Sequence, residues 1–461
     1  MSIPEIETLV ARAREAQTAF EANGSQERYD RAAQAAAWAI MEPARNRELA
    51  ELAVETTGLG NVPDKITKNH RKTLGLMRDI KDAVTFGVLS DDPATGITEI
   101  ARAKGVVGAI VPSTNPAATP ANNIINALKC GNAIIVAPSP KGVACAERLL
   151  EFVHAEFAKI GEDPALVQMV PAPGSKEKTQ ALMELCDMIV ATGSQNNVHR
   201  AQTAGTPAVA VGAGNVTVIV DETADLVAAA EKIQASKCFD NATSCSSENA
   251  VVVVDAVYDA FVAAMAKAGG ALVEDEANVV AKLWPGGHLN RAVIAQDADK
   301  MIAALDLDLP EGTEYIAVPT SGIGAEHPLS GEKLSRVLAL YRAGDFDEAV
   351  AVTRRIQLHQ GAGHSVGLHS TDSERPMVLA TAIPTSRVIV NQAHTFATGG
   401  SFTNGMPFSL SMGCGTWGGN SVNDNVNYRH FMQSTKIVRE IPSREPALED
   451  IFAAYWADAG K

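Results

Sequence analysis

The chain has 461 residues, of which 46% are hydrophobic and 20% charged, so it is long enough to form two or three domains. Its net charge of −15 at pH 7 argues against broad binding to nucleic-acid phosphates. The N-terminal sequence lacks the apolar stretch of a secretory signal, and no window reaches the ~18 apolar residues of a membrane span. Its six cysteines form no Cys-x-x-Cys pair. We therefore expect a cytoplasmic protein without disulfides and without nucleic-acid or membrane partners.

The first half of the chain changes from helical to alternating patterning. Residues 4–60 place apolar side chains at helical spacing, and residues 90–104 predict a polar hairpin that turns at Pro93–Gly96. Short β-branched runs then alternate with helical segments, which indicates a parallel sheet covered on both faces. The expected strands are 105–112, 132–138, 166–173, 187–194, 207–214 and 216–221, with helices near 118–130, 142–160 and 175–185.

A second series of alternating segments follows. The expected helices are 224–238, 256–269, 346–358 and 373–382, and the expected strands are 248–255, 334–343, 364–370 and 387–392. Residues 270–333 have no regular pattern, and 393–425 are loop-like. An edge strand at 434–441 and a short helix end the chain. The fold class is therefore α/β, with two parallel-type sheets.

A polar loop between an expected helix and strand carries Cys245. A thiol in such a loop is accessible, and nearby helix termini or cations can lower its pKa and make it a nucleophile. The competing interpretation is that a cysteine is a small buried hydrophobic residue. We prefer that interpretation for Cys130, Cys145 and Cys186, which lie in apolar helical stretches, whereas Cys238 is a minor rival to Cys245.

Asn115 lies between a strand that ends at Val111 and a helix that starts near Pro120. Ligands of open α/β sheets collect at the carboxyl ends of the strands. The amide of Asn115 can donate a hydrogen bond to an oxyanion, and one such donor lowers the barrier by about 3 kcal/mol. The alternative is an ordinary turn asparagine before Pro116.

Thr192, Gly193 and Ser194 form another junction of strand and helix. Their backbone N–H groups and hydroxyls can hold a pyrophosphate at a helix N-terminus, although Ser194 can also be a plain N-cap. The nearby VGAGNVT segment (211–217) begins like a Gly-x-Gly-x-x-Gly motif. Thr217 occupies the third glycine position and a strand follows, so we reject it as a dinucleotide fingerprint.

Taken in this order, these segments resemble the aldehyde dehydrogenase superfamily, specifically its CoA-acylating branch. The likeness covers nearly the whole chain and includes MGCGTWGGNSVNDNVNYRH at 412–430. It implies a small oligomerisation β element made from 90–104 and 434–441, and hence a homodimer or homotetramer. The implied division is a cofactor-binding domain at 1–222, a catalytic domain at 223–420 and a C-terminal return with the oligomerisation segment at 421–461.

The resemblance also implies roles for single residues. Cys245 matches the nucleophile, and Asn115 matches the oxyanion-hole asparagine that works with the Cys245 N–H. Glu332 matches the acid that holds the nicotinamide ribose, where the alternative is a solvated glutamate. No metal is implied. The matching cofactor-binding positions are Ser139, Thr192, Gly193, Ser194, Gly214 and Glu332.

Two departures from the family pattern are informative. Hydrolytic members activate water with a glutamate in a Glu-Leu-Gly-Gly-Lys segment, but 211–215 here reads Val-Gly-Ala-Gly-Asn. Glu248 is a possible substitute, although acylating members also carry an acid there. Many NAD-specific members place a glutamate where this chain has Pro140. Lys141 follows, so NADP is permitted and NAD remains possible.

The resemblance implies that Cys245 attacks the aldehyde, becomes a thioester after hydride transfer and then passes the acyl group to CoA. Sulfoacetaldehyde is the first choice of substrate, and succinate semialdehyde and acetaldehyde remain open. An anionic substrate needs a cation, for which Arg387, His364, His394 and Arg429 are candidates; the alternative for each is a surface residue or a satisfied core residue. The competing classes are a hydrolytic aldehyde dehydrogenase and a non-catalytic relative of the same fold.

Overall fold

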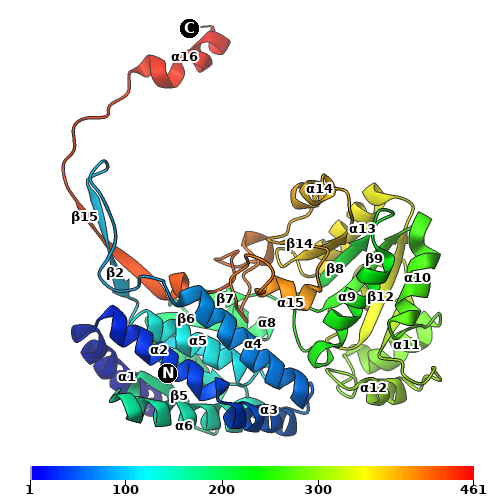
Figure 1. Cartoon of the computed structure of the whole chain (residues 1–461), viewed down its shortest axis with the longest axis horizontal. Coiled ribbons are helices and arrows are strands. Elements are labelled where there is room, and N and C mark those ends of the chain that lie inside the picture. Colours follow the sequence, from blue (N-terminus) through cyan, green and yellow to red (C-terminus); the bar gives the residue numbers. More distant parts are fainter. Residues whose placement is uncertain (1–2, 461) are drawn as a thin grey trace.

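The computed structural model describes residues 3–460 and has two parallel sheets and one small antiparallel sheet (Figure 1). The first sheet has the strand order β5-β4-β3-β6-β7. The chain reverses direction across the sheet between β3 and β6, which makes their carboxyl ends a topological switch point. Its strands are β3 (Val106–Val111), β4 (Ala133–Pro138), β5 (Val167–Met169), β6 (Met188–Thr192) and β7 (Ala208–Val211).

The second sheet has the order β10-β11-β12-β9-β8-β13-β14, and all of its pairs are parallel. Its strands are β8 (Val216–Val220), β9 (Glu248–Val254), β10 (Gly270–Leu272), β11 (Tyr315–Pro319), β12 (Val337–Ala343), β13 (Val366–His369) and β14 (Val388–Val390). We expected β8 to close the first series, but it lies inside the second sheet, between β9 and β13. The sequence did not predict β10 and β11.

Helices cover the first sheet on both faces. They are α1 (Pro4–Ala22), α2 (Gln26–Met41), α3 (Pro43–Thr57), α4 (Val62–Ile80), α5 (Ala118–Lys129), α6 (Val143–Ile160), α7 (Lys176–Leu185) and α8 (Gln195–Thr203). The first core joins side chains of these helices to both faces of β3 and β4. Every residue of β3 is buried, because the strand is apolar on both faces. The predicted helices of 4–60 are confirmed, whereas α4 was not predicted.

The second sheet is covered in the same way. Its helices are α9 (Leu226–Cys238), α10 (Tyr258–Lys267), α11 (Glu276–Leu283), α12 (Ala298–Leu305), α13 (Phe346–His359), α14 (Arg375–Ala382) and α15 (His394–Thr398). Two further cores fill its two faces. All seven residues of β9 are buried. No helix within residues 3–460 is long and apolar enough to cross a membrane.

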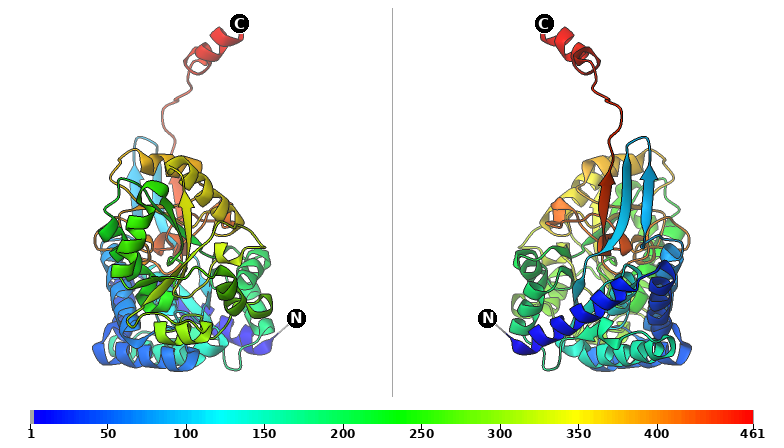
Figure 2. Two further views of the ribbon diagram at one scale, coloured as in Figure 1. Left: turned by 90° about the vertical axis from the view of Figure 1, so that its right-hand side faces the viewer. Right: turned by 90° about the vertical axis from the view of Figure 1, so that its left-hand side faces the viewer.

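The hairpin predicted at 90–104 and the predicted tail strand pair with each other. β1 (Val88–Asp92), β2 (Ile97–Ala103) and β15 (Met432–Val438) form the antiparallel sheet, with β15 at one edge. The chain then extends away from the body to α16 (Leu448–Ala459), as Figures 1 and 2 show from three directions. None of the described residues of α16 is buried.

At the site, the carboxyl ends of strands in the first sheet face the amino ends of strands in the second sheet. Asn115 and Thr192 lie at the carboxyl edge of the first sheet, after or at the end of β3 and β6. Cys245 and Glu332 lie at the amino edge of the second sheet, ahead of β9 and β12. The short segment 212–215 connects the two edges. The order of the strands in the two sheets therefore brings these four residues together although they are distant in the sequence.

Candidate active site

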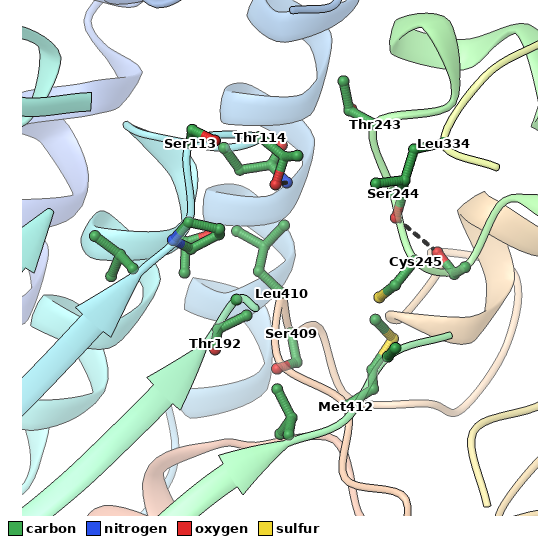
Figure 3. A pocket seen from close by; sticks show the side chains of 18 of the residues that line it. Ser113, Thr114, Thr192, Thr243, Ser244, Cys245, Leu334, Ser409, Leu410 and Met412 are labelled. Carbon is green, nitrogen blue, oxygen red and sulfur yellow. Dashed lines mark hydrogen bonds between the residues drawn. The ribbon is translucent and has the colours of Figure 1, made fainter. Parts of the chain in front are cut away.

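A cavity of about 470 Å³ lies where the two edges meet (Figure 3). Seven of the eight predicted site residues line it: Asn115, Ser139, Thr192, Gly193, Ser194, Cys245 and Glu332. Gly214 does not line it. A Cβ at Gly214 would lie 1.9 Å from the carbonyl oxygen of Cys245. The glycine therefore allows the connecting segment to pass directly against the loop of Cys245.

Cys245 points into the cavity from a turn closed by a 2.8 Å hydrogen bond between the hydroxyls of Ser244 and Ser246 (Figure 3). It is partly exposed, unlike the other five cysteines, which are buried. The predicted choice of Cys245 among the cysteines fits this placement. Although part of the residue is exposed, its thiol is largely enclosed by protein, and this burial raises the pKa of the Cys245 thiol to about 12, with the Glu332 carboxylate adding to the shift. The sequence suggested a lowered pKa instead.

The approach to Cys245 has an unusual backbone. Asp240, Asn241 and Ala242 are consecutive left-handed residues with φ of 49°, 54° and 60°. Each such residue costs of order 1 kcal/mol or more and persists only when its surroundings hold it. Lys65 and Lys68 of α4 both form ion pairs with the fully buried Asp240 carboxylate. α4 therefore fixes the loop that carries the thiol.

Lys68 connects that loop to Asn115. Its ammonium group donates to Asn115 Oδ1 at 3.0 Å and to Thr243 Oγ1 at 2.9 Å, besides its ion pair with Asp240. Because the amide oxygen of Asn115 accepts from Lys68, the amide nitrogen is the group left for the cavity. Its contact with the Thr114 hydroxyl is only a long one of 3.5 Å. This arrangement suits a donor to an oxyanion.

The carboxyl edge of the first sheet fits a dinucleotide. The Ser139 hydroxyl is buried and has no hydrogen-bond partner among the described residues, as expected for a group that meets a ligand. Ser194 is the N-cap of α8, with its side chain accepting from Asn197 N at 3.4 Å. It therefore both caps the helix and lines the cavity. Gly193 has a φ of 153°, which a β-carbon disfavours.

Carboxylates are scarce at the site. Within residues 3–460, Glu332 is the only acidic residue that lines the cavity. Burial raises its pKa to about 8, against the opposing charges of Lys237 and Lys333. Glu248, the possible substitute base, does not line the cavity and is 1% exposed. The segment 211–215 contributes three lining residues, none of them acidic.

The four cations considered for an anionic substrate do not line the cavity. Arg387 is buried and donates to Asn425 Oδ1 and to three backbone carbonyl oxygens, so its donors hold the C-terminal loops. Burial lowers the pKa of His364 to about 3 and that of His394 well below its usual value. Arg429 is exposed. All four candidates therefore lie outside the lining of the cavity, as surface residues or satisfied core residues.

The cations that do line the cavity are Lys68, Arg71 and Lys72, all on α4. They were not predicted from the sequence, because residues 62–80 were not assigned to an element. Their i, i+3, i+4 spacing in KNHRK places them on one face of a helix. A basic stripe on a helix that packs inside a domain is the signal that could have found them.

Comparison with known proteins gives a consistent result. The model of the aldehyde dehydrogenase family matches residues 2–281. The chain is 54% identical over 460 residues to the acylating sulfoacetaldehyde dehydrogenase of Cupriavidus necator, covering 99% of this chain and 93% of that protein. It is 37% identical over 436 residues to the acetylating succinate-semialdehyde dehydrogenase of Clostridium kluyveri, covering 94% and 95%. The chain belongs to the aldehyde dehydrogenase family.

Solved structures agree with the fold. An acetylating aldehyde dehydrogenase from Geobacillus thermoglucosidasius superposes with a TM-score of 0.92 at 30% identity, covering 96% of this chain and 98% of that one. A propionaldehyde dehydrogenase from Rhodopseudomonas palustris, solved with bound CoA and an acylated cysteine, gives 0.84 at 25% identity, covering 94% and 97%. The predicted α/β class and the resemblance to acylating aldehyde dehydrogenases are confirmed.

Proposed function

We propose that this chain oxidises sulfoacetaldehyde to its CoA thioester, with NADP or NAD as the hydride acceptor. Two observations support the proposal. The relative that is 54% identical is an acylating sulfoacetaldehyde dehydrogenase. The cavity joins a thiol and an amide donor, and Glu332 is its only acid within residues 3–460. The second observation carries the acylating chemistry, and the first carries the choice of aldehyde.

Cys245 acts as the nucleophile. Its Sγ releases its proton to solvent and forms a bond to the aldehyde carbon, and the carbonyl oxygen becomes an oxyanion. The Asn115 amide and the backbone N–H of Cys245 donate to that oxygen. The carbon would lose a hydride, for which nicotinamide, when bound, would be the acceptor, and the oxidised carbon would then be a thioester of Cys245. Burial favours the uncharged thiol in the free protein, so deprotonation accompanies attack.

Transfer to CoA completes the reaction. The CoA thiol attacks the thioester carbon, the new C–S bond forms, and the bond to Cys245 Sγ breaks with the thiol restored. A thiol has a pKa near 8.5 and needs little help from a base, whereas water needs a carboxylate that activates it. Glu332 is already assigned to the nicotinamide ribose, and Glu248 is buried away from the cavity. The site therefore favours CoA over water.

The cofactor fits the carboxyl edge of the first sheet. Ser139 and Glu332 would hold the two riboses, and the turn 192–194 would hold the pyrophosphate. NADP is the preferred form because Pro140, rather than a glutamate, follows Ser139, and both Pro140 and Lys141 are exposed. A lysine there attracts a 2′-phosphate, whereas a glutamate would repel it.

A homo-oligomer is part of the proposal, with a second copy of the chain as the partner. β15 is an edge strand whose residues after Met432 are exposed, and unpaired edges invite pairing. α16 carries Leu448, Ile451 and Tyr455 at 62%, 60% and 67% exposure, away from the body of its own chain (Figure 1). Such an apolar arm is stabilised by covering against a neighbouring subunit.

A panel of three aldehydes tests the proposal: sulfoacetaldehyde, succinate semialdehyde and acetaldehyde, each with and without CoA and with NADP or NAD. We expect the highest kcat/KM with sulfoacetaldehyde, CoA and NADP. Cys245→Ala should abolish reduction of the cofactor. Retained turnover in Cys245→Ala, or equal rates without CoA, would refute the acylating mechanism. A preference for succinate semialdehyde would change the proposed substrate but leave the acylating mechanism in place.

A further inference from the structure

The three cations on α4 differ in how they are neutralised. Lys68 forms an ion pair with Asp240. Arg71 and Lys72 form no ion pair with a carboxylate within residues 3–460, although both line the cavity. Cations removed from water are normally paired, because desolvation of an unpaired charge is unfavourable; Lys72 is buried and Arg71 half-buried. Two cations without a carboxylate partner thus line the same cavity as Cys245.

Lys72 is a buried ammonium group whose hydrogen bonds go to backbone oxygens and which lies 5.8 Å from the centre of the Phe408 ring. Its Nζ donates to the carbonyl oxygens of Gly399 at 2.5 Å and Ser409 at 3.0 Å. An ammonium group has three donors, so one remains. Burial and, to a smaller extent, the neighbouring charges of Arg71 and Lys68 together lower the pKa of Lys72 to about 7. An anion in the cavity would reverse that shift.

Only one of the three guanidinium nitrogens of Arg71 donates hydrogen bonds to described residues. One guanidinium nitrogen, Nη2, donates to Phe396 O at 3.0 Å and to Ser401 Oγ at 3.3 Å, and the guanidinium lies 5.0 Å from the centre of the Phe396 ring. Burial lowers its pKa. The contacts of Nη2 leave Nε and Nη1 to face a ligand. The other arginine of the helix, Arg78, instead forms an ion pair with Asp79.

We propose that Arg71 and Lys72 bind the anionic end of the substrate, so that α4 sets the preference for a charged aldehyde. This inference rests on the proposed function. A sulfonate offers three acceptor oxygens, which match the free donors of a guanidinium and an ammonium group. Its aldehyde carbon, two bonds from the sulfur, lies toward Cys245. A phosphate of CoA has related chemistry, and the experiment separates the two sources.

The test compares Arg71→Gln and Lys72→Met with wild type, with sulfoacetaldehyde and with uncharged acetaldehyde as substrates. Arg78→Gln and Lys81→Met are matched controls, because both residues lie on or at the end of α4 and neither lines the cavity. We expect each test variant to raise KM for sulfoacetaldehyde by about 10- to 100-fold, the range for a lost charge-assisted hydrogen bond. KM for acetaldehyde should change less than about threefold, and the controls should match wild type.

Inhibition provides a second readout that does not need full activity. Ethanesulfonate should compete with acetaldehyde in wild type, and its inhibition constant should rise in both test variants by a similar factor. Equal losses with charged and uncharged aldehydes would overturn the inference. A rise in KM for CoA alone would assign the two cations to a CoA phosphate and also overturn it. If wild type prefers succinate semialdehyde while the variants lose only that preference, the proposed substrate fails and the anion site stands.

Discussion

Replacing Lys68 tests how the oxyanion donor is oriented. Lys68→Met removes the 3.0 Å hydrogen bond to Asn115 Oδ1, and nothing then fixes which end of the amide faces the cavity. The bond is charge-assisted and worth about 1.5–3 kcal/mol, so we expect kcat to fall by about 10- to 100-fold. If Lys68 acts only by orienting Asn115, the fall stays within that of Asn115→Ala, for which loss of one oxyanion donor predicts about 10²–10³; a larger fall would come from the loop of Cys245, which Lys68 also contacts through Asp240.

The assay is a double-mutant cycle in single-turnover formation of reduced cofactor. If Lys68 acts through Asn115, the double variant should be about as slow as Asn115→Ala alone. The loss should be equal for sulfoacetaldehyde and acetaldehyde, unlike that of the neighbouring Lys72. Lys65, which pairs with Asp240 at 3.2 Å, is left in place in the variant, and a melting curve checks that the fold survives. Multiplicative losses in the double variant would refute the positioning role.

Three further outcomes are expected. Because the pKa of Lys72 is lowered to about 7, its charge is present below that pH and is lost above it. KM for sulfoacetaldehyde should therefore rise from pH 7 to 9 while KM for acetaldehyde stays level. A parallel rise for both aldehydes would argue against a charged Lys72. Lys141→Glu should raise KM for NADP by about tenfold or more and leave that for NAD nearly unchanged; no change in the NADP-to-NAD ratio would place the 2′-phosphate elsewhere. Removal of residues 444–461 should reduce the oligomer in sedimentation while each subunit stays folded; an unchanged mass would show that α16 does not join subunits.

The sequence predicted most of the elements, because β-branched runs such as that of β9 and the helices between them are local patterns. It could not predict sheet membership, since β8 pairs with β9 and β13, which lie far along the chain. The short strand β11 was missed for a related reason. Its five residues are flanked by irregular loops, and it is a strand because β10 and β12 pair with it.

The site shows the same division between local and long-range information. The positions of Cys245 and Asn115 follow from strand-end motifs and from the family pattern. The cations proposed to bind the substrate could not be predicted in this way, because the sequence does not distinguish an arginine that binds a ligand from one that stabilises loops. The donors of Arg387 are occupied by backbone carbonyl oxygens of loops. Arg71, in contrast, lines the cavity beside Cys245 although the two residues are more than 170 positions apart in the sequence.

The most direct test of the thioester follows the mass of the protein through one turnover. The enzyme is mixed with sulfoacetaldehyde and NADP without CoA, freed of small molecules, and then given either buffer or CoA. We predict a sulfoacetyl adduct on the peptide of Cys245 that persists in buffer and is discharged as the acyl-CoA when CoA is added. An adduct on another residue, or its loss to free acid at the same rate in buffer, would contradict the account.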